Sequence, residues 1–287
     1  MRRVLVTGAG GYVGRHLVRA LADRGVGVVA VQRSGPVADP RAHLLAVDFA
    51  SLRADDLRAL GPIDCVIHLA WSDGFNHGAA SHINALPDHV RFVRETGVAG
   101  IPQFVGMGSM HEIGYWEGMI GEATPSAPRS MYGIAKHALR EAARLLAEQE
   151  RQVFQWLRSY YITGDDSRNK SLFAKILQWE GEGYTSFPFN SGRSQYDFID
   201  VAELADQIAS ASLQTAVTGV IECCSGQPVA LKDKVEAFLA ANHLAIRPEY
   251  GAFPERSYDS PAVWGDATKI QRILVAEAAR PTKPGRD

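Results

Sequence analysis

A tyrosine and a lysine stand one helical turn apart in the segment SMYGIAKHALREAARLL. These residues, Tyr132 and Lys136, are four positions apart, so a helix places both side chains on one face. A phenol has an ordinary pKa of about 10 and is therefore a poor acid-base group at neutral pH. An ammonium group one turn away favours the phenolate and lowers that pKa. The pair predicts general acid-base catalysis by Tyr132, with Lys136 adjusting its pKa.

A glycine-rich segment near the N-terminus, TGAGGYVG at 7–14, has the pattern of a phosphate-binding turn. It follows the β-branched run RVLVT and precedes a helical pattern that Gly25 closes. In this context glycines permit a tight turn, a close approach of the backbone to a pyrophosphate, and close packing of helix on strand. The free N–H groups and dipole of the helix favour phosphate. The segment predicts a dinucleotide site with contacts from Gly8, Gly11, Tyr12, Val13 and Gly14. A positively charged nicotinamide bound there would act together with Lys136 in lowering the Tyr132 pKa.

The end of the second predicted strand carries no carboxylate. An acidic residue there would accept a hydrogen bond from the ribose 2′-hydroxyl of NAD and repel the 2′-phosphate of NADP. This chain has Gln32, Arg33 and Ser34 instead. Arg33 can bind a phosphate and stack on adenine, and Ser34 adds a hydroxyl, so we expect NADP rather than NAD. The alternative is that Arg33 is an ordinary exposed arginine. Asp48, followed by Phe49, is expected to meet the adenine amino group.

Strands alternate with helices along the first part of the chain, which predicts an α/β fold with a doubly wound parallel sheet. Ser109 follows the fifth predicted strand, and such strands deliver catalytic groups at their carboxyl ends. We expect its hydroxyl to bind the substrate oxygen beside Tyr132, the alternative being an ordinary loop serine. The predicted strands are 3–7, 26–31, 43–47, 65–69, 103–107 and 153–159, and the helices are 13–24, 52–60, 82–96 and 131–150.

Beyond Gly164 the alternation loosens, which indicates a smaller α+β lobe. Helices are predicted near 171–179, 201–212, from about 231, and near 267–274. Strands are predicted near 184–187, 195–199, 219–223 and 246–250. We therefore expect a dinucleotide-binding domain over 1–164, to which later segments return, and a substrate-binding lobe over 165–287.

The composition excludes several other functions. The chain has 287 residues, a formal net charge of −2 and no basic stripe, which argues against a nucleic-acid partner. It has no apolar run of the roughly 18 residues that a membrane span needs, and its N-terminal apolar run is too short for a signal peptide. The three cysteines lack the spacing of a zinc site, and no metal is expected. We expect a cytoplasmic enzyme.

Taken together, these segments resemble the extended short-chain dehydrogenase/reductases, in the NAD(P)-dependent epimerase/dehydratase group that modifies nucleotide sugars. The resemblance implies a Rossmann nicotinamide domain, a C-terminal sugar-nucleotide lobe and a triad of Ser109, Tyr132 and Lys136, with Lys136 also holding the nicotinamide ribose. It also implies a homodimer formed through the helices at 82–96 and 131–150. The matching segments are TGAGGYVG, HLAW with Leu69 and Ala70, MYGIAK, LRSYYITG, YDFIDVAELA, CSGQPVALKD and WGDATKIQRIL. Counted back from Trp264, Arg256 matches an arginine that in relatives grips the diphosphate.

Two departures from the family pattern affect the substrate. Tyr161 stands where relatives often have an asparagine near the diphosphate, and Tyr196 where they have an arginine; Arg193 is a candidate replacement. Sugar 4,6-dehydratases carry Asp-Glu directly after the triad Ser or Thr, whereas this chain has Met110 and His111, which disfavours dehydration. His111 falls where some epimerase-reductases keep a second acid-base residue, and a loop-packing histidine explains it equally well.

Three functions fit these observations. The first is NADPH-dependent reduction of a ketone, at C4 of a nucleotide-linked 4-keto-6-deoxyhexose, because reductases of this family consume NADPH. The second is a nucleotide-sugar 4-epimerase, which would keep one NAD tightly bound. The third is a non-catalytic NADP-sensing protein, which the intact Tyr132–Lys136 pair disfavours.

Overall fold

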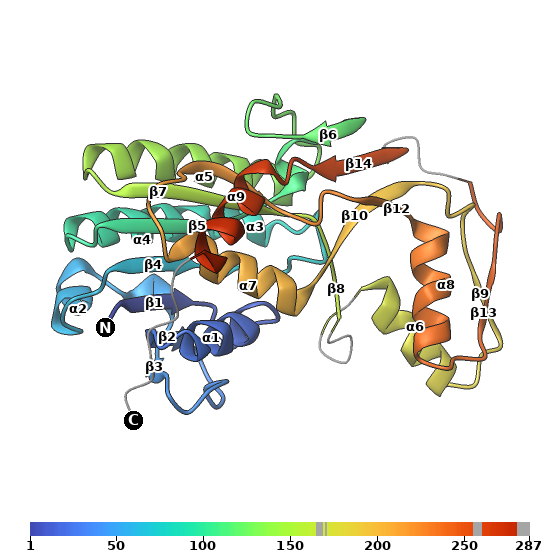
Figure 1. Cartoon of the computed structure of the whole chain (residues 1–287), viewed down its shortest axis with the longest axis horizontal. Coiled ribbons are helices and arrows are strands. Elements are labelled where there is room, and N and C mark those ends of the chain that lie inside the picture. Colours follow the sequence, from blue (N-terminus) through green and yellow to red (C-terminus); the bar gives the residue numbers. More distant parts are fainter. Residues whose placement is uncertain (165–168, 170, 255–259, 280–287) are drawn as a thin grey trace.

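A seven-stranded parallel sheet forms the centre of the larger lobe (Figure 1). The computed structural model describes residues 1–164, 169, 171–254 and 260–279. The strand order is β11-β7-β5-β4-β1-β2-β3, so the chain runs outward in both directions from β1 and confirms the doubly wound arrangement. The strands are β1 (Arg3–Thr7), β2 (Gly27–Gln32), β3 (His43–Ala46), β4 (Cys65–His68), β5 (Gln103–Ser109), β7 (Val153–Ser159) and β11 (Gly219–Cys223).

Alternating side chains of the central strands build two cores. On β1, Val4 and Val6 join one buried cluster with Leu17, while Leu5 joins the other with Phe92. Successive residues of a strand point to opposite faces, so a strand covered on both faces is apolar throughout. The helices of this lobe are α1 (Gly14–Asp23), α2 (Ala54–Ala59), α3 (Ser81–Asn84), α4 (Leu86–Val98), α5 (Met131–Gln149), α7 (Val201–Ser212) and α9 (Thr268–Ala278).

The smaller lobe lies at one end of the molecule, beyond β8 and β10 (Figure 1). A second sheet of order β12-β10-β14-β6 connects it to the larger lobe, with β8 also pairing with β10, and β9 pairs with β13. The strands of the connecting sheet are β6 (Gly118–Ile120), β8 (Tyr161–Thr163), β10 (Gln195–Asp200), β12 (Pro228–Ala230) and β14 (Ala262–Gly265). The remaining elements of the smaller lobe are α6 (Leu172–Gly181), β9 (Ser186–Pro188), α8 (Leu231–Ala241) and β13 (Arg247–Glu249).

Several elements differ from the sequence expectation. The strand predicted near 219–223 is β11, which pairs with β7 at the edge of the large sheet, and α7 and α9 also pack on the larger lobe. Later segments were expected to return to the larger domain, although these three elements were first predicted as parts of the smaller lobe. The single helix predicted over 82–96 is two helices, because Pro87 lacks an N–H and starts a new helix in the first turn of α4.

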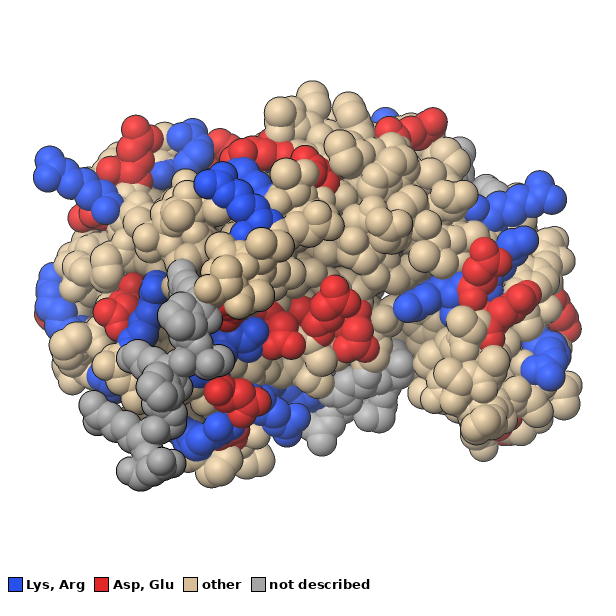
Figure 2. All heavy atoms as spheres, viewed as in Figure 1, with Lys and Arg blue, Asp and Glu red and all other residues tan. Residues whose placement is uncertain are grey.

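The surface carries both signs of charge. Figure 2 shows Lys and Arg side chains interspersed with Asp and Glu on the visible face, without a continuous basic stripe. Within the described ranges, no helix combines the length and apolar character that crossing a bilayer requires.

Candidate active site

Tyr132 lies in the first turn of α5, where two contacts fix the start of the helix. The Ser130 hydroxyl accepts a hydrogen bond from the Gly133 amide at 3.1 Å. The His77 carbonyl accepts one from the Tyr132 amide at 3.0 Å. Both amides belong to the helix start, where no partner exists within the helix itself. The backbone of the predicted proton donor is thereby held from two sides.

Lys136 lies one turn further along α5 and is 4% exposed. Its Nζ donates a hydrogen bond to the Met107 carbonyl at 2.8 Å and stands 3.8 Å from the centroid of the Trp71 ring. The same nitrogen is 6.0 Å from the centroid of the Tyr132 ring. The helix therefore places the amine and the phenol together near the carboxyl end of β5.

Ser109 is the last residue of β5 and lies beside this pair. Its side chain is buried and hydrogen-bonded to the Tyr132 side chain. Its Oγ also accepts a hydrogen bond from the His111 amide at 3.3 Å, at the start of the short helix η2 (Met110–Glu112). Two hydroxyl groups and one amine thus lie where such sheets bind their reactants.

Burial determines the protonation of the phenol and the amine. It raises the pKa of Tyr132 to about 12; the hydrogen bond from Ser109 lowers that pKa and the Glu112 carboxylate raises it. Burial lowers the pKa of Lys136 to about 7, against the opposing effect of Glu112. The lowered Tyr132 pKa predicted from the sequence concerns the protein with a positively charged nicotinamide bound and stays a prediction; in the protein without cofactor, burial is the largest influence on this pKa.

Aromatic and imidazole rings surround the Tyr132 ring. The His77 ring stacks on it with centroids 5.0 Å apart and planes at 11°. The rings of His82, Trp71 and His111 approach it edge-on at 5.2, 6.0 and 6.0 Å. Burial lowers the pKa of His111 to about 3, so its imidazole is neutral at pH 7. Among the residues that the structure describes, no three His, Cys, Asp or Glu side chains are grouped to hold a metal ion.

The turn between β1 and α1 has no room for a Cβ atom at Gly8 or Gly14. Gly8 has a φ of 69°, and a Cβ there would lie 2.7 Å from the Ala70 nitrogen. A Cβ on Gly14 would lie 2.1 Å from the Gly8 carbonyl oxygen. Only glycine is compatible with these approaches, and the resulting cradle at a helix N-terminus fits a dinucleotide pyrophosphate. The other predicted cofactor residues on or beside this turn are Gly11, Tyr12, Val13 and Leu69.

Gln32 ends β2 and organises the segment that follows. Its Nε2 donates hydrogen bonds to the carbonyl oxygens of Ser34, Gly35 and Pro36 at 3.1, 2.9 and 3.1 Å. Its Oε1 is buried without a hydrogen-bond partner among the described residues and faces the glycine turn, 3.0 Å from a Cβ placed on Gly10. The side chains of Arg33 and Ser34 are exposed.

Asp48 and Phe49 have clear local roles. Asp48 is exposed and accepts a hydrogen bond from the Ala50 amide at 3.0 Å, so it caps the short helix η1 (Phe49–Ser51). Phe49 packs its ring against His68, His89 and Phe92. The adenine contact expected of this pair stays a prediction.

The predicted substrate residues fall into two groups. Met110 and His111 follow Ser109 directly, and Met110 is buried. Tyr161 lies in β8, and the centroid of its ring is 4.4 Å from the centroid of the Tyr196 ring. Arg193 is exposed and lies just before β10. This second group therefore lies at the smaller lobe. Arg256 lies outside the described residues.

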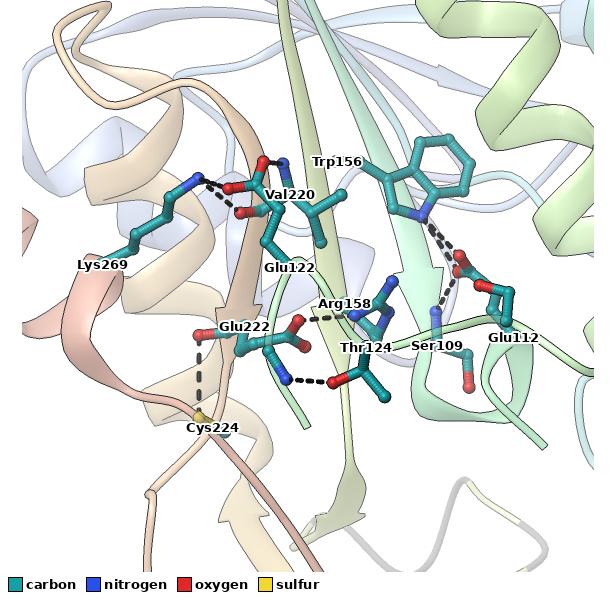
Figure 3. Close-up of polar contacts among 12 residues, drawn as sticks. Ser109, Glu112, Glu122, Thr124, Trp156, Arg158, Val220, Glu222, Cys224 and Lys269 are labelled. Atoms are coloured by element: carbon teal, nitrogen blue, oxygen red, sulfur yellow. Dashed lines mark hydrogen bonds and ion pairs between the residues drawn. The ribbon is translucent and has the colours of Figure 1, made fainter. Parts of the chain in front are cut away.

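Sequence reasoning missed Trp71, His77 and Glu112. The first two come from the segment after β4 and reach Lys136 and Tyr132 only through the fold. Glu112 is fully buried and accepts hydrogen bonds from the Ser109 amide and the Trp156 indole (Figure 3). Only Trp71 left a signal in the sequence, because it extends the HLA motif after a buried strand.

Comparison with known proteins points to one family. The model of the NAD dependent epimerase/dehydratase family matches residues 4–221. A dTDP-6-deoxy-L-talose 4-dehydrogenase (NAD(+)) of Aggregatibacter actinomycetemcomitans is 41% identical over 269 residues, covering 91% of this chain and 98% of that protein. A dTDP-6-deoxy-L-talose 4-dehydrogenase (NAD(P)(+)) of Kitasatospora kifunensis is 25% identical over 83% of this chain and 78% of that protein.

A solved structure has the same fold. MoeE5 in complex with UDP-glucuronic acid and NAD superposes with a TM-score of 0.81 at 25% identity, covering 95% of this chain and 92% of that one.

Proposed function

Because the chain belongs to the NAD dependent epimerase/dehydratase family, we propose that it reduces a ketone on a nucleotide sugar with a nicotinamide cofactor. The family match agrees with the resemblance found in the motifs. The proposed substrate is a nucleoside-diphosphate-linked 4-keto-6-deoxyhexose, reduced at C4, and the two 4-dehydrogenase relatives support this choice together with dTDP as the nucleotide. The observation that carries the proposal is the grouping of Ser109, Tyr132 and Lys136 beside the carboxyl end of β5.

Each of these three residues has a role in ketone reduction. A nicotinamide cofactor whose pyrophosphate lies on the glycine turn would supply the hydride. Tyr132 is protonated at neutral pH and can therefore give its proton to the ketone oxygen, to which the Ser109 hydroxyl donates a second hydrogen bond. Lys136 holds the nicotinamide ribose and, when protonated, stabilises the phenolate left behind. In the reverse reaction the phenolate takes the proton of the sugar hydroxyl.

NADPH is the proposed cofactor. No carboxylate ends β2, Arg33 is free to reach solvent, and Gln32 offers a neutral amide oxygen toward the glycine turn. This combination removes the repulsion that an acidic residue exerts on a 2′-phosphate. The names of the relatives include both NAD(+) and NAD(P)(+), so the measurement is kcat/KM with NADPH against NADH. We expect the NADPH value to be higher.

The direct experiment supplies dTDP-6-deoxy-L-talose with NADP⁺ or NAD⁺, follows the absorbance of the reduced nicotinamide, and identifies the keto product by NMR. Stoichiometric formation of reduced cofactor and ketosugar is the expected result. NAD that co-purifies with the protein, combined with sugar epimerisation without net use of cofactor, would instead establish the 4-epimerase. Cofactor binding without conversion of any dTDP or UDP sugar would favour the third hypothesis, a non-catalytic NADP-sensing protein.

The Tyr132→Phe variant tests the proposed mechanism. It removes the proton donor but leaves the ring that packs against His77, so the fold and the cofactor site should persist. General acid catalysis typically contributes about 10²–10⁴-fold in rate, so kcat should fall by a factor of at least about 10². Cofactor affinity, measured by the shift in melting temperature, should stay at the wild-type value. Near-normal turnover would exclude Tyr132 as the acid.

A further inference from the structure

Glu112 lies beneath the proposed active site as a fully buried carboxylate. Its Oε1 accepts hydrogen bonds from the Ser109 amide at 2.8 Å and from the Trp156 indole at 2.9 Å, and Trp156 also reaches its Oε2 at 3.1 Å (Figure 3). Arg140 of α5 approaches Oε2 at 3.5 Å. Three elements, β5, β7 and α5, therefore direct donors to one carboxylate that no step of the proposed reaction uses.

The first turn of α5 packs directly on the helix that carries Glu112. A Cβ on Gly133 would lie 2.3 Å from the His111 carbonyl oxygen, so only glycine allows this approach. The neighbouring Tyr132 is consequently close enough to feel the Glu112 charge, as is Lys136 one turn later. Contact between η2 and α5 thus fixes the distance from the carboxylate to both reacting groups.

Other charged groups face Glu112 from the elements around it. Arg140 and His137 lie on α5, with the Arg140 Nη2 3.0 Å from the His137 Nδ1. Arg158 of β7 forms a buried ion pair with Glu222 of β11 at 2.5 Å. Each of these cations is shared with a second carboxylate, since Arg158 is paired with Glu222 and Arg140 with both Glu112 and Glu141. Burial raises the pKa of Glu222 to about 7, so Glu222 is fully charged only above neutral pH.

We propose that Glu112 is a positioning residue that fixes the Ser109 main chain and whose charge opposes the formation of the Tyr132 phenolate. The proposal rests on the roles of Ser109 and Tyr132 in the proposed function. A carboxylate opposes the formation of a second anion nearby and favours a nearby cation. Glu112 therefore adds to the effect of burial on Tyr132 and favours the charged form of Lys136.

The test measures the ionisation of Tyr132 itself. A fluorinated tyrosine at position 132 ionises at lower pH than tyrosine and gives a fluorine NMR signal from this residue alone. In Glu112→Gln, which removes the charge and keeps the shape, the midpoint should fall by about half a pH unit or more. Lys136 is already neutral in that pH range, so its own response does not mask the effect. Glu112→Asp keeps the charge and should restore the midpoint.

Two further variants separate charge from packing. Trp156→Phe removes an indole donor but keeps the carboxylate, so the midpoint should match that of the wild type. If Glu112→Gln alone does not fold, the pair Glu112→Gln/Arg140→Gln leaves no uncompensated charge between these two side chains, and its midpoint should lie below that of Arg140→Gln. An unchanged midpoint in a folded Glu112→Gln, or in the double variant against Arg140→Gln, overturns the proposal.

This titration needs neither substrate nor cofactor, so it decides the inference even if the proposed reductase activity fails. The positioning of the Ser109 main chain by Glu112 is tested separately, by the kcat and KM of a variant. In Glu112→Asp the shorter carboxylate loses the Ser109 amide, and kcat should fall at least tenfold while KM for the cofactor stays constant. A wild-type kcat in that variant would exclude the positioning role.

Discussion

Lys136 combines two environments that oppose each other. Its nitrogen is hydrogen-bonded to a carbonyl and lies against an indole face, both of which suit a cation, yet the residue is almost completely buried. Desolvation exceeds these gains and lowers the pKa to about 7 from an ordinary value of 10.5. The free protein therefore carries a buried lysine that binds and releases its proton near neutral pH.

Lys136→Met should change how stability depends on pH. Between about pH 7 and pH 10 the unfolded wild-type chain binds a proton that the folded chain has released, so the stability of the folded state rises with pH. The contribution of this group is at most about 1.4 kcal/mol per pH unit, and the variant should lack it. Denaturant unfolding of both proteins without cofactor measures the difference. Lys269→Met, at a lysine paired with Glu122 near the surface, is the control and should retain the wild-type slope.

Sequence spacing predicted the proposed catalytic trio but not its surroundings. Tyr132 and Lys136 share one helix, so a local rule sufficed, and Ser109 follows from its place after an apolar strand. His77 and Glu112 belong to segments whose contacts with Tyr132 depend on how the helices pack. The effect of burial on the Tyr132 pKa in the protein without cofactor was missed for the same reason, since burial is a property of the folded chain.

The turn from β1 into α1 depends on the absence of a side chain at Gly14. In Gly14→Ala the new methyl would lie 2.1 Å from the Gly8 carbonyl oxygen and 2.9 Å from the Ala9 Cα, so the turn must move. Such overpacking costs about 1–3 kcal/mol and displaces the phosphate-binding amides. We expect a lower melting temperature and a loss of the stabilisation by NADPH. Gly181→Ala, where the methyl meets no atom within 4 Å, should leave both quantities near wild type.

The bounds of the longer elements were predicted closely, whereas several of the short strands were missed. Apolar periodicity located β1, β7 and α5 to within a residue at each end, because burial of one or both faces dictates their composition. The strands β6, β8, β12 and β14 have three or four residues each, too few for a period to show. Their pairing depends on partners distant in the chain, as in β14 with β6.

At the scale of the whole molecule, α5 presents an uncovered apolar stripe. Met131, Ile134 and Leu145 are 46%, 43% and 50% exposed and lie at spacings of three and eleven residues, which place them on one helical face. The homodimer expected from the resemblance would cover this stripe, with α5 packing against its counterpart. We therefore propose that the protein associates through α4 and α5.

Leu145→Glu should separate this proposed dimer. A charge placed in an apolar helix interface costs several kcal/mol on association, while the exposed side chain contributes little to the folded monomer. Light scattering coupled to size-exclusion chromatography should show twice the monomer mass for the wild type and the monomer mass for the variant. Val275→Glu on α9 changes a side chain that is 70% exposed elsewhere on the surface and should leave the mass unchanged. A monomeric wild type would refute the proposal.

The return of α7, β11 and α9 to the large sheet has a consequence for engineering. Neither lobe is one continuous stretch of chain, because α7 and β11 of the larger lobe lie in the sequence between elements that precede and follow them in the smaller lobe. Cutting the chain after Gly164 would therefore remove the edge strand β11 and the covering helices α7 and α9 from the larger lobe. The smaller lobe therefore cannot be exchanged as one continuous segment, and its properties have to be changed by substitutions within the intact chain.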